Sequence, residues 1–185
     1  DTGGATPWWQ TQTIKWFEWF PGQVDTPQLT DVPFSVGAKG RIDPEIVRIG
    51  DTWFMFYVIM DWNNGEWWDI YYSKSETGPF GPYIDEWNMS QMVEHGIEEA
   101  PCVSSSLENG SKLYWSVNDS SVDSTIRRGK LEGVINRLRV TEDTGFKIAA
   151  VGSPVCTHPD LHGGKLRATL RDPNTGRFYI GELEL

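Results

Sequence analysis

The chain has 185 residues, of which 38% are hydrophobic and 13% aromatic, and its formal net charge is −10 at pH 7. This length and composition predict one domain with a well-buried core, and the negative charge disfavours nucleic acid, whose phosphates attract basic surfaces. No run of about 18 apolar residues occurs, so no membrane span is predicted, and the lack of a charged segment followed by an apolar stretch at the start favours a mature or trimmed chain.

Residues 1–40 form an aromatic-rich leader. Its sequence Trp-Phe-Glu-Trp-Phe at residues 16–20 alternates poorly between apolar and polar side chains, which predicts an edge strand or an interface patch. The leader is a candidate to supply closing strands for the domain expected over residues 41–185.

The first predicted strands follow a glycine-bearing turn. Gly50 and Asp51 have good hairpin chemistry, and an apolar, aromatic run at residues 52–58 follows them. A second polar turn at residues 61–66 then leads to another strand-like run at residues 67–73.

The same order of turn and strand returns later in the chain. An apolar run at residues 112–117 follows the polar turn at residues 108–111. Strands at residues 165–171 and 177–183 flank Asp-Pro-Asn-Thr-Gly at residues 172–176, a strong hairpin turn.

A proline recurs at spacings of 57 and 58 residues, at Pro44, Pro101 and Pro159. Each has an ionisable residue within two positions on its N-terminal side, and these residues are Asp43, Glu99 and His158. A fixed period of this size is typical of propeller blades, in which equivalent residues approach one centre. The chain is therefore predicted to be all-β, with antiparallel β-propeller-like blades near residues 43–98, 99–157 and 158–185. Residues 133–140 are the only short helix candidate.

Three segments carry a resemblance to a known family. They read Arg-Ile-Asp-Pro-Glu-Ile-Val at residues 41–47, Ser-Lys-Ser-Glu-Thr-Gly-Pro-Phe at residues 73–80 and Glu-Glu-Ala-Pro at residues 98–101. In their order and spacing, over about residues 40–117, they resemble the five-bladed β-propeller glycosidases, especially glycoside hydrolase family 43. In that family Asp-Pro opens a blade, Ser-x-x-Gly-Pro-Phe closes one, and Glu-Gly-Pro carries the general acid.

The resemblance implies a pair of carboxyl groups that cleave a glycosidic bond. One protonates the leaving group, and the other is ionised and acts as base or nucleophile. By analogy Glu99 is the general acid, and Asp43 is either the base that activates water or the aspartate that tunes the acid. Glu98 is the alternative acid if the strand register shifts by one residue, because such a slip reverses which side chain faces the site.

Three further residues are candidates for substrate binding. Trp62 lies in the turn Asp-Trp-Asn-Asn-Gly, where an exposed indole ring suits a sugar face. His158 occupies the repeat position of Asp43, and Arg41 opens the Asp-Pro segment. No cofactor and no zinc site are predicted, since His158 and His162 lack a cysteine or acidic partner at zinc-like spacing; a structural calcium ion held by carboxylate and backbone oxygens is compatible with the sequence.

Two departures from the family stand out. A closed five-bladed ring with this repeat needs about 285 residues, so the leader, a second copy, a partner chain or a longer natural chain would have to complete it. A third carboxylate is also missing, because no second Asp-Pro opens a blade. The segment Arg-Asp-Pro at residues 171–173 is similar to a motif of related fructan-cleaving propellers, but Asn-Thr-Gly follows it and favours an ordinary hairpin turn.

The cysteines and three short motifs bear on where in the cell or outside it the protein is located. Cys102 and Cys156 lie near the starts of adjacent repeats, where they either form a disulfide or remain two buried thiols. Three Asn-x-Ser sequons, at Asn88, Asn109 and Asn118, favour a secreted, extracellular or periplasmic protein together with such a disulfide.

Two functions remain open from the sequence. The first is a glycosidase of the arabinofuranosidase or xylosidase type, in which Glu99 and Asp43 are acid and base. The second is a non-catalytic carbohydrate-binding or assembly protein that keeps the blade pattern and lacks the full ring. A third carboxylate beside Asp43 and Glu99 would favour the first.

Overall fold

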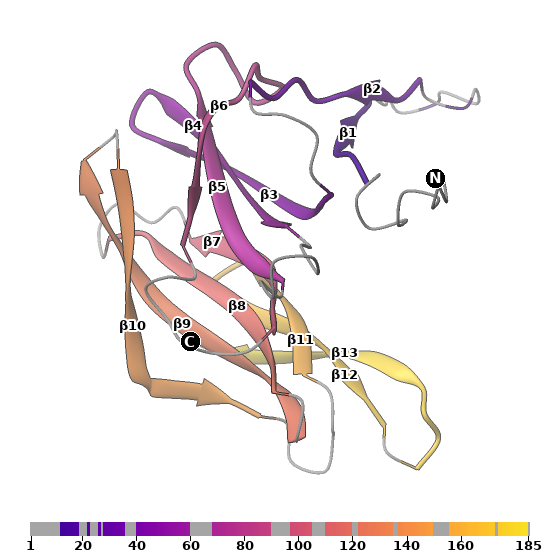
Figure 1. The fold of residues 1–185 in the computed structure, drawn as a ribbon. Helices are drawn as coiled ribbons and strands as arrows, with labels where there is room; N and C mark the ends of the chain where they lie inside the picture. The colour runs from indigo at the N-terminus through magenta and orange to yellow at the C-terminus, as the bar shows by residue number, and fades with distance from the viewer. Residues whose placement is uncertain are drawn as a thin grey trace, which may run out of the picture.

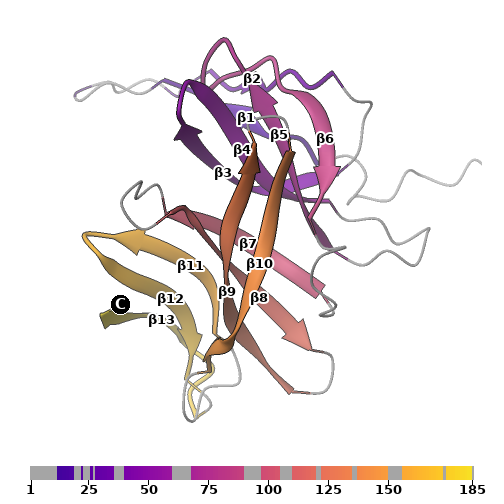
Figure 2. The ribbon, with the colours of Figure 1, turned by 90° about the vertical axis from the view of Figure 1, so that its left-hand side faces the viewer.

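The computed structural model consists of antiparallel β-strands, and the residues that it describes contain no helix. It describes residues 12–18, 22, 26, 28–35, 40–59, 68–89, 97–104, 110–119, 122–134, 137–149, 156–172 and 174–184. Three sheets follow one another along the chain, and we call them the first, second and third blades (Figures 1 and 2). The prediction of an all-β, antiparallel, propeller-like fold is confirmed.

Each blade pairs its strands in chain order. The first blade contains β3 (Arg41–Ile49), β4 (Thr52–Ile59), β5 (Asp69–Ser75) and β6 (Ile84–Asn88). The second blade contains β7 (Ile97–Ser104), β8 (Lys112–Asp119), β9 (Val122–Val134) and β10 (Arg137–Ile148). The third blade contains β11 (Cys156–His162), β12 (Lys165–Arg171) and β13 (Phe178–Glu184).

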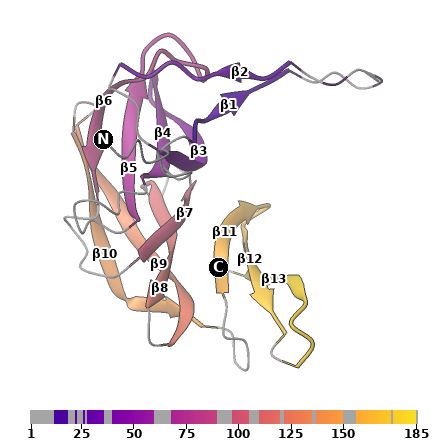
Figure 3. The ribbon, with the colours of Figure 1, turned by 45° about the vertical axis from the view of Figure 1, so that its right-hand side comes forward.

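The first strand of every blade is the innermost. β7 contacts both β3 and β11, so the first strands of the three blades lie together at the centre. β13 lies at the outer edge of the third blade, away from β7 (Figure 3). The large side chains of Phe178, Tyr179 and Ile180 on β13 are exposed.

The faces between blades are filled with apolar side chains. Between the first and second blades Phe54, Phe56 and Tyr72 pack with Leu113 and Trp115. These side chains are almost fully buried, and each such burial contributes about 1.5–3 kcal/mol. The hydroxyl of Tyr72 also accepts a hydrogen bond from the backbone N–H of Leu138 at 2.9 Å, which ties β5 to β10.

The second and third blades share a smaller core. It contains Cys102 and Tyr114 from the second blade and Leu166 and Ala168 from the third. Phe146 packs against this core and meets the ring of Tyr114 edge to face. Because β-strand side chains alternate between the two faces, the second blade is apolar on both sides and fits between its neighbours.

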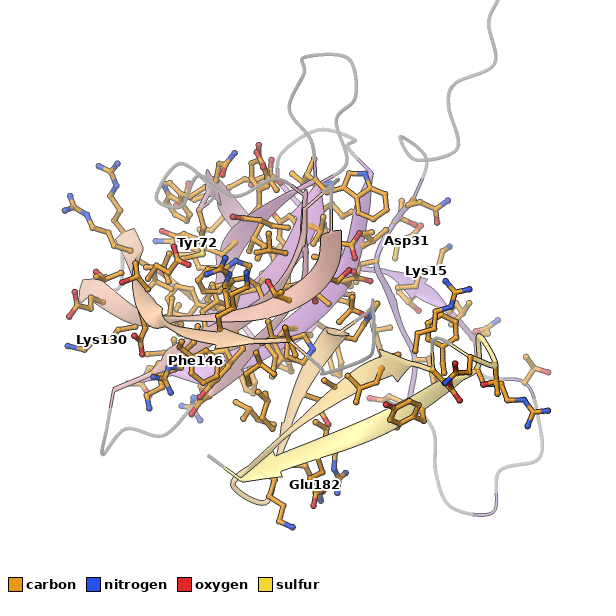
Figure 4. All side chains as sticks on the ribbon, turned by 90° about the horizontal axis from the view of Figure 1, so that it is seen from below. Lys15, Asp31, Tyr72, Lys130, Phe146 and Glu182 are labelled. Carbon is orange, nitrogen blue, oxygen red and sulfur yellow. The ribbon has the colours of Figure 1, made fainter. Side chains whose placement is uncertain are left out.

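The leader covers the outer face of the first blade. Its strands β1 (Lys15–Trp16) and β2 (Thr30–Asp31) form a two-stranded sheet. Lys15 and Asp31 form an ion pair at 2.9 Å (Figure 4), and Trp16 stacks on Phe80. Ile14, Val32 and Phe34 pack with Tyr57 and its neighbours on this face, which keeps the face out of water.

Two expectations are corrected by the structure. Residues 133–140 are not a helix, because residues 133–134 end β9 and residues 137–140 begin β10, and the two strands pair as a hairpin. Cys102 does not form the expected disulfide, since it is a buried free cysteine. Cys102 packs instead in the apolar core that the second and third blades share.

The hairpin expected after β12 is confirmed. The carboxylate of Asp172 accepts hydrogen bonds from the backbone N–H groups of Asn174 and Thr175 and from the hydroxyl of Thr175. An aspartate that bonds the backbone two residues ahead is an ordinary turn former. Asp172 therefore has a structural explanation in the turn.

Candidate active site

The innermost strand of every blade carries the same backbone irregularity. The residue before each repeated proline has a left-handed conformation, with φ of 50° at Asp43, 47° at Ala100 and 52° at His158. At the same place each strand shifts register against its neighbour. Such bulges re-aim side chains, and left-handed non-glycine residues often occur at functional sites. This recurrence makes the centre of the three blades the candidate site.

Glu99 lies one residue before the left-handed Ala100. Its backbone position pairs with Ser116 on β8. Burial raises the pKa of the Glu99 carboxyl, the charge of Asp43 raises it further, and the charge of His158 lowers it. Asp43, Glu99 and His158 come from three different blades, and the fold brings them close enough for their charges to interact.

His158 is held from two directions. Its Nδ1 shares a hydrogen bond of 2.8 Å with the hydroxyl of Thr157, the preceding residue. Its backbone N–H donates to the hydroxyl oxygen of Ser116 in the second blade at 3.0 Å. The imidazole itself is exposed, so it is available to a ligand.

Glu98 faces the other way. Its side chain is only 1% exposed and lines a small cavity together with Ile70, Met89, Leu113, Trp115 and Val140, between the first and second blades. Its backbone N–H donates to the carbonyl of Trp68 in the first blade. The register therefore gives Glu99 the place beside Asp43 and His158, and Glu98 the place in the interblade core.

Arg41 lies in a buried network on the outer face of the first blade. Its Nε and Nη2 both donate to Oε2 of Glu86, at 3.2 and 2.8 Å, and its guanidinium lies 4.2 Å from the ring centroid of Phe34. The hydroxyl of Tyr57 donates to the same Glu86 oxygen at 2.7 Å. Arg41 is 6% exposed, so this placement favours a structural role over the expected contact with substrate.

A second ring of polar residues lies two positions after the left-handed residues. Its members are Glu45, Cys102 and Asp160. Burial raises the pKa of Glu45, and so does the charge of Asp160, while the N–H of Val103 donates to its carboxylate at 3.4 Å. This hydrogen bond links β3 to β7.

Cys102 is not a nucleophile in this ring. Burial raises the pKa of its thiol to about 12, with a further contribution from the charge of Glu45. A thiol of that pKa is almost wholly protonated at neutral pH, and the thiolate is the reactive form.

The remaining expectations concern ligands. Trp62 lies outside the described residues. Within the described ranges no group of three or more His, Cys, Asp and Glu side chains is arranged to hold a metal ion, and no helix is long and apolar enough to cross a membrane.

Two residues that contribute to these networks, Glu86 and Ser116, were not predicted from the sequence. Glu86 lies in Ile-Asp-Glu-Trp-Asn, which has no motif, and its partner Arg41 is 45 residues away. Ser116 sits in an ordinary apolar strand. Its importance follows only from the register with Glu99 and from the packing of the third blade against the second.

The site contains a carboxyl group that suits proton donation. Burial and the charge of Asp43 raise the pKa of Glu99, so Glu99 keeps its proton to a higher pH than an ordinary glutamate does. The exposed imidazole adds a hydrogen-bonding group from the third blade.

Comparison with known proteins supports the fold. No family model matches the chain, and no curated protein matches it in sequence. Among solved structures, a thermostable family-43 glycoside hydrolase is similar, with a TM-score of 0.56 and 14% identity over 84% of this chain. An endo-arabinase from Bacteroides thetaiotaomicron VPI-5482 has a TM-score of 0.52 and 16% identity over 78% of the chain. An alpha-L-arabinofuranosidase from Lactobacillus brevis has a TM-score of 0.58 and 10% identity over 85% of the chain.

The match covers only part of each solved structure. The chain spans 56% of the length of each of the three. Three consecutive blades are described here, with the leader on the outer face of the first. The chain therefore has the fold of a partial β-propeller of the family-43 glycoside hydrolase type.

Proposed function

We propose that this protein hydrolyses glycosidic bonds of an oligosaccharide or polysaccharide, with Glu99 as general acid and Asp43 as its partner carboxylate. The observation that carries the proposal is that Asp43 and Glu99 each lie at the bulge of an innermost strand and come close enough for the charge of Asp43 to act on Glu99. A general acid must keep its proton near the working pH, and burial and a neighbouring carboxylate both raise the pKa of Glu99 in that direction.

The proposed reaction uses both groups in one cycle. Glu99 donates its proton to the glycosidic oxygen as the bond from that oxygen to the anomeric carbon breaks. Asp43, as base, takes a proton from the water that attacks the anomeric carbon, or it holds Glu99 protonated while another carboxylate fills that role. His158 presents an exposed imidazole to the sugar hydroxyls.

The substrate class in this proposal comes from the structural neighbours. Two of them are an endo-arabinase and an alpha-L-arabinofuranosidase, so arabinose-containing polysaccharides are tested first and xylosides second. We place the protein outside the cytoplasm or in the periplasm, where such polymers are met.

The second candidate function is carbohydrate binding without turnover. It is favoured because, among the described residues, Asp43 is the carboxylate whose charge raises the pKa of Glu99, while the resemblance implies a third carboxylate. In either case a second copy or a partner chain is the proposed source of further blades.

Hydrolysis of aryl arabinofuranosides, xylosides and galactosides tests the proposal. We expect Glu99→Gln and Asp43→Asn to lower kcat/KM by about 10²- to 10⁴-fold. The loss for Glu99→Gln is expected to be smaller with a dinitrophenyl leaving group, which needs little protonation. Asp160→Asn is the matched control, because it removes a nearby carboxylate to which no step is assigned.

Two results would decide against hydrolysis. One is the absence of turnover with saccharide still quenching tryptophan fluorescence, which would establish the binding protein. The other is an activity that Glu99→Gln and Asp43→Asn leave at the native level.

A further inference from the structure

The backbone of His158 is detached from its own sheet. In the pairing of β11 with β12, Thr157 lies opposite Thr169 and Asp160 lies opposite Arg167, so the bulge between them takes His158 and Pro159 out of register. A buried N–H that leaves a ladder needs another acceptor. The N–H of His158 finds it in the second blade, at the hydroxyl oxygen of Ser116.

Ser116 is well placed to act as a fixed acceptor. Its side chain is fully buried, so the hydroxyl does not exchange its partner for water. It also pairs directly with Glu99 in the β7–β8 ladder, and directly opposed residues point to the same face of a sheet. One hydroxyl therefore joins the strand that carries His158 to the position opposite Glu99.

We propose that Ser116 is a positioning residue, which fixes the imidazole of His158 beside the carboxyl group of Glu99 through its hydrogen bond to the His158 backbone. This inference rests on the proposed function for its meaning in catalysis, but its geometry does not depend on turnover. Thr157 completes the hold by its bond to Nδ1 of His158.

The left-handed backbone explains why such a hold is needed. His158 is not a glycine, and its φ of 52° carries a strain of about 1–2 kcal/mol. Loss of the hydrogen bond to Ser116 would therefore allow this segment to return to an ordinary backbone conformation. Relaxation would move the imidazole relative to Glu99. The charges that face Glu99 are Asp43 from β3 and His158 from β11, and these two oppose each other.

The consequence can be measured at Glu99. Because His158 lowers the pKa of Glu99 and Asp43 raises it, a displaced imidazole leaves the effect of Asp43 and of burial unopposed. Ser116→Ala is therefore expected to raise the pKa of Glu99 and to move the basic limb of the pH profile of kcat/KM upward. His158→Ala is expected to shift both quantities in the same direction and further.

The test is an NMR titration of the full chain with ¹³C-labelled glutamate side chains, in which the Glu99 signal is assigned by its loss in Glu99→Gln. Ser116→Thr retains a hydroxyl at the same atom and should restore the native value. Ser73→Ala is the matched control, since Ser73 is as deeply buried and bonds Tyr57 instead. If Ser116→Ala does not fold, Thr157→Val removes the other hold on His158 and should shift Glu99 in the same direction.

The outcomes separate the two proposals. A Glu99 pKa that moves in His158→Ala but stays native in Ser116→Ala and Thr157→Val overturns the positioning role. A pKa that moves in none of the variants overturns it as well, since His158 then does not act on Glu99. Absence of hydrolysis by the native chain defeats the proposed function alone and leaves the titration valid.

Discussion

The charge of Asp43 in the first blade raises the pKa of the Glu99 carboxyl group in the second blade. Each residue lies at the bulge of an innermost strand, one or two residues before a proline. The relationship between them follows from the packing of β3 against β7, and it has consequences for stability as well as for chemistry.

The pH dependence of stability should reveal the raised pKa of Glu99. A pKa that is higher in the folded than in the unfolded chain adds stability at low pH, and this stability is lost as the pH rises through the folded value. Glu99→Gln, which remains neutral, is therefore expected to be more stable than the native protein at pH 7 and to lose this advantage below the ordinary glutamate pKa of 4.5. Thermal unfolding between pH 3.5 and 8 measures it; a variant that is less stable than native at pH 7 would contradict the electrostatic account.

Ala100→Gly should stabilise the protein. Ala100 has φ of 47°, which costs an L-residue about 1–2 kcal/mol and glycine very little. Glycine also makes the unfolded chain more flexible by about 0.4–1 kcal/mol, so we expect a net gain of about 0.5–1 kcal/mol in urea unfolding. Ala168→Gly, at a buried strand position without positive φ, is the control and should destabilise. A loss in both variants would mean that the backbone strain at Ala100 is not relieved.

Replacing one member of the ion pair between Arg41 and Glu86 should lower the free energy of unfolding more than replacing both members. Both side chains are almost fully buried, so Arg41→Met or Glu86→Gln alone is expected to lower the free energy of unfolding by about 3–5 kcal/mol. The double replacement Arg41→Met with Glu86→Met should recover part of this loss, because no buried charge remains. Asp31→Asn breaks the exposed pair with Lys15 and should change the free energy of unfolding very little, because an exposed ion pair is screened by solvent. A loss at Arg41 as small as that at Asp31 would show that the pair is solvated.

Gly129→Ala should disturb the centre of the second blade. A β-carbon at this position would approach Cγ2 of Val140 to 2.6 Å and the carbonyl oxygen of Thr141 to 3.1 Å. Overpacking of this kind costs about 1–3 kcal/mol. Gly78→Ala, where nothing lies within 4 Å and φ is not positive, should leave the unfolding midpoint unchanged. Equal midpoints for Gly129→Ala and the native protein would argue against the close packing of β9 on β10.

The thiol of Cys102 should react slowly in the native protein. It is buried, and its pKa is raised to about 12, so little thiolate is exposed to reagent at pH 8. We expect alkylation of the peptide that contains Cys102 to be slow in buffer and fast in denaturant, as followed by mass spectrometry. Rapid labelling of this peptide in the folded protein would mean that the second and third blades separate readily.

Much of the architecture is readable from local chemistry. Glycine-bearing turns and apolar runs predicted strands at residues 52–58 and 165–171, and the structure has β4 and β12 there, because turn geometry and strand alternation depend on near neighbours in the sequence. The period of the prolines predicted the blades because each repeat forms the same kind of sheet and packs on its neighbours in the same way.

The failures share one physical cause. The hairpin of β9 and β10 and the free thiol of Cys102 both depend on which strands and blades meet. The local sequence at residues 133–140 is compatible with a helical turn. The pairing of β10 with β9 along most of their length makes this region part of a hairpin instead. Adjacent Glu98 and Glu99 were distinguished only by register, which a sequence leaves open.

The three ionisable groups at the centre belong to successive blades, and this bears on the order in which the site is assembled. Asp43 and Glu99 are both present once the second blade has packed on the first, but His158 arrives only with β11. During synthesis the chain thus carries an unfinished centre until its third blade docks. In this part of the molecule the packing of the third blade on the second is therefore the step that brings the imidazole of His158 to the two carboxyl groups.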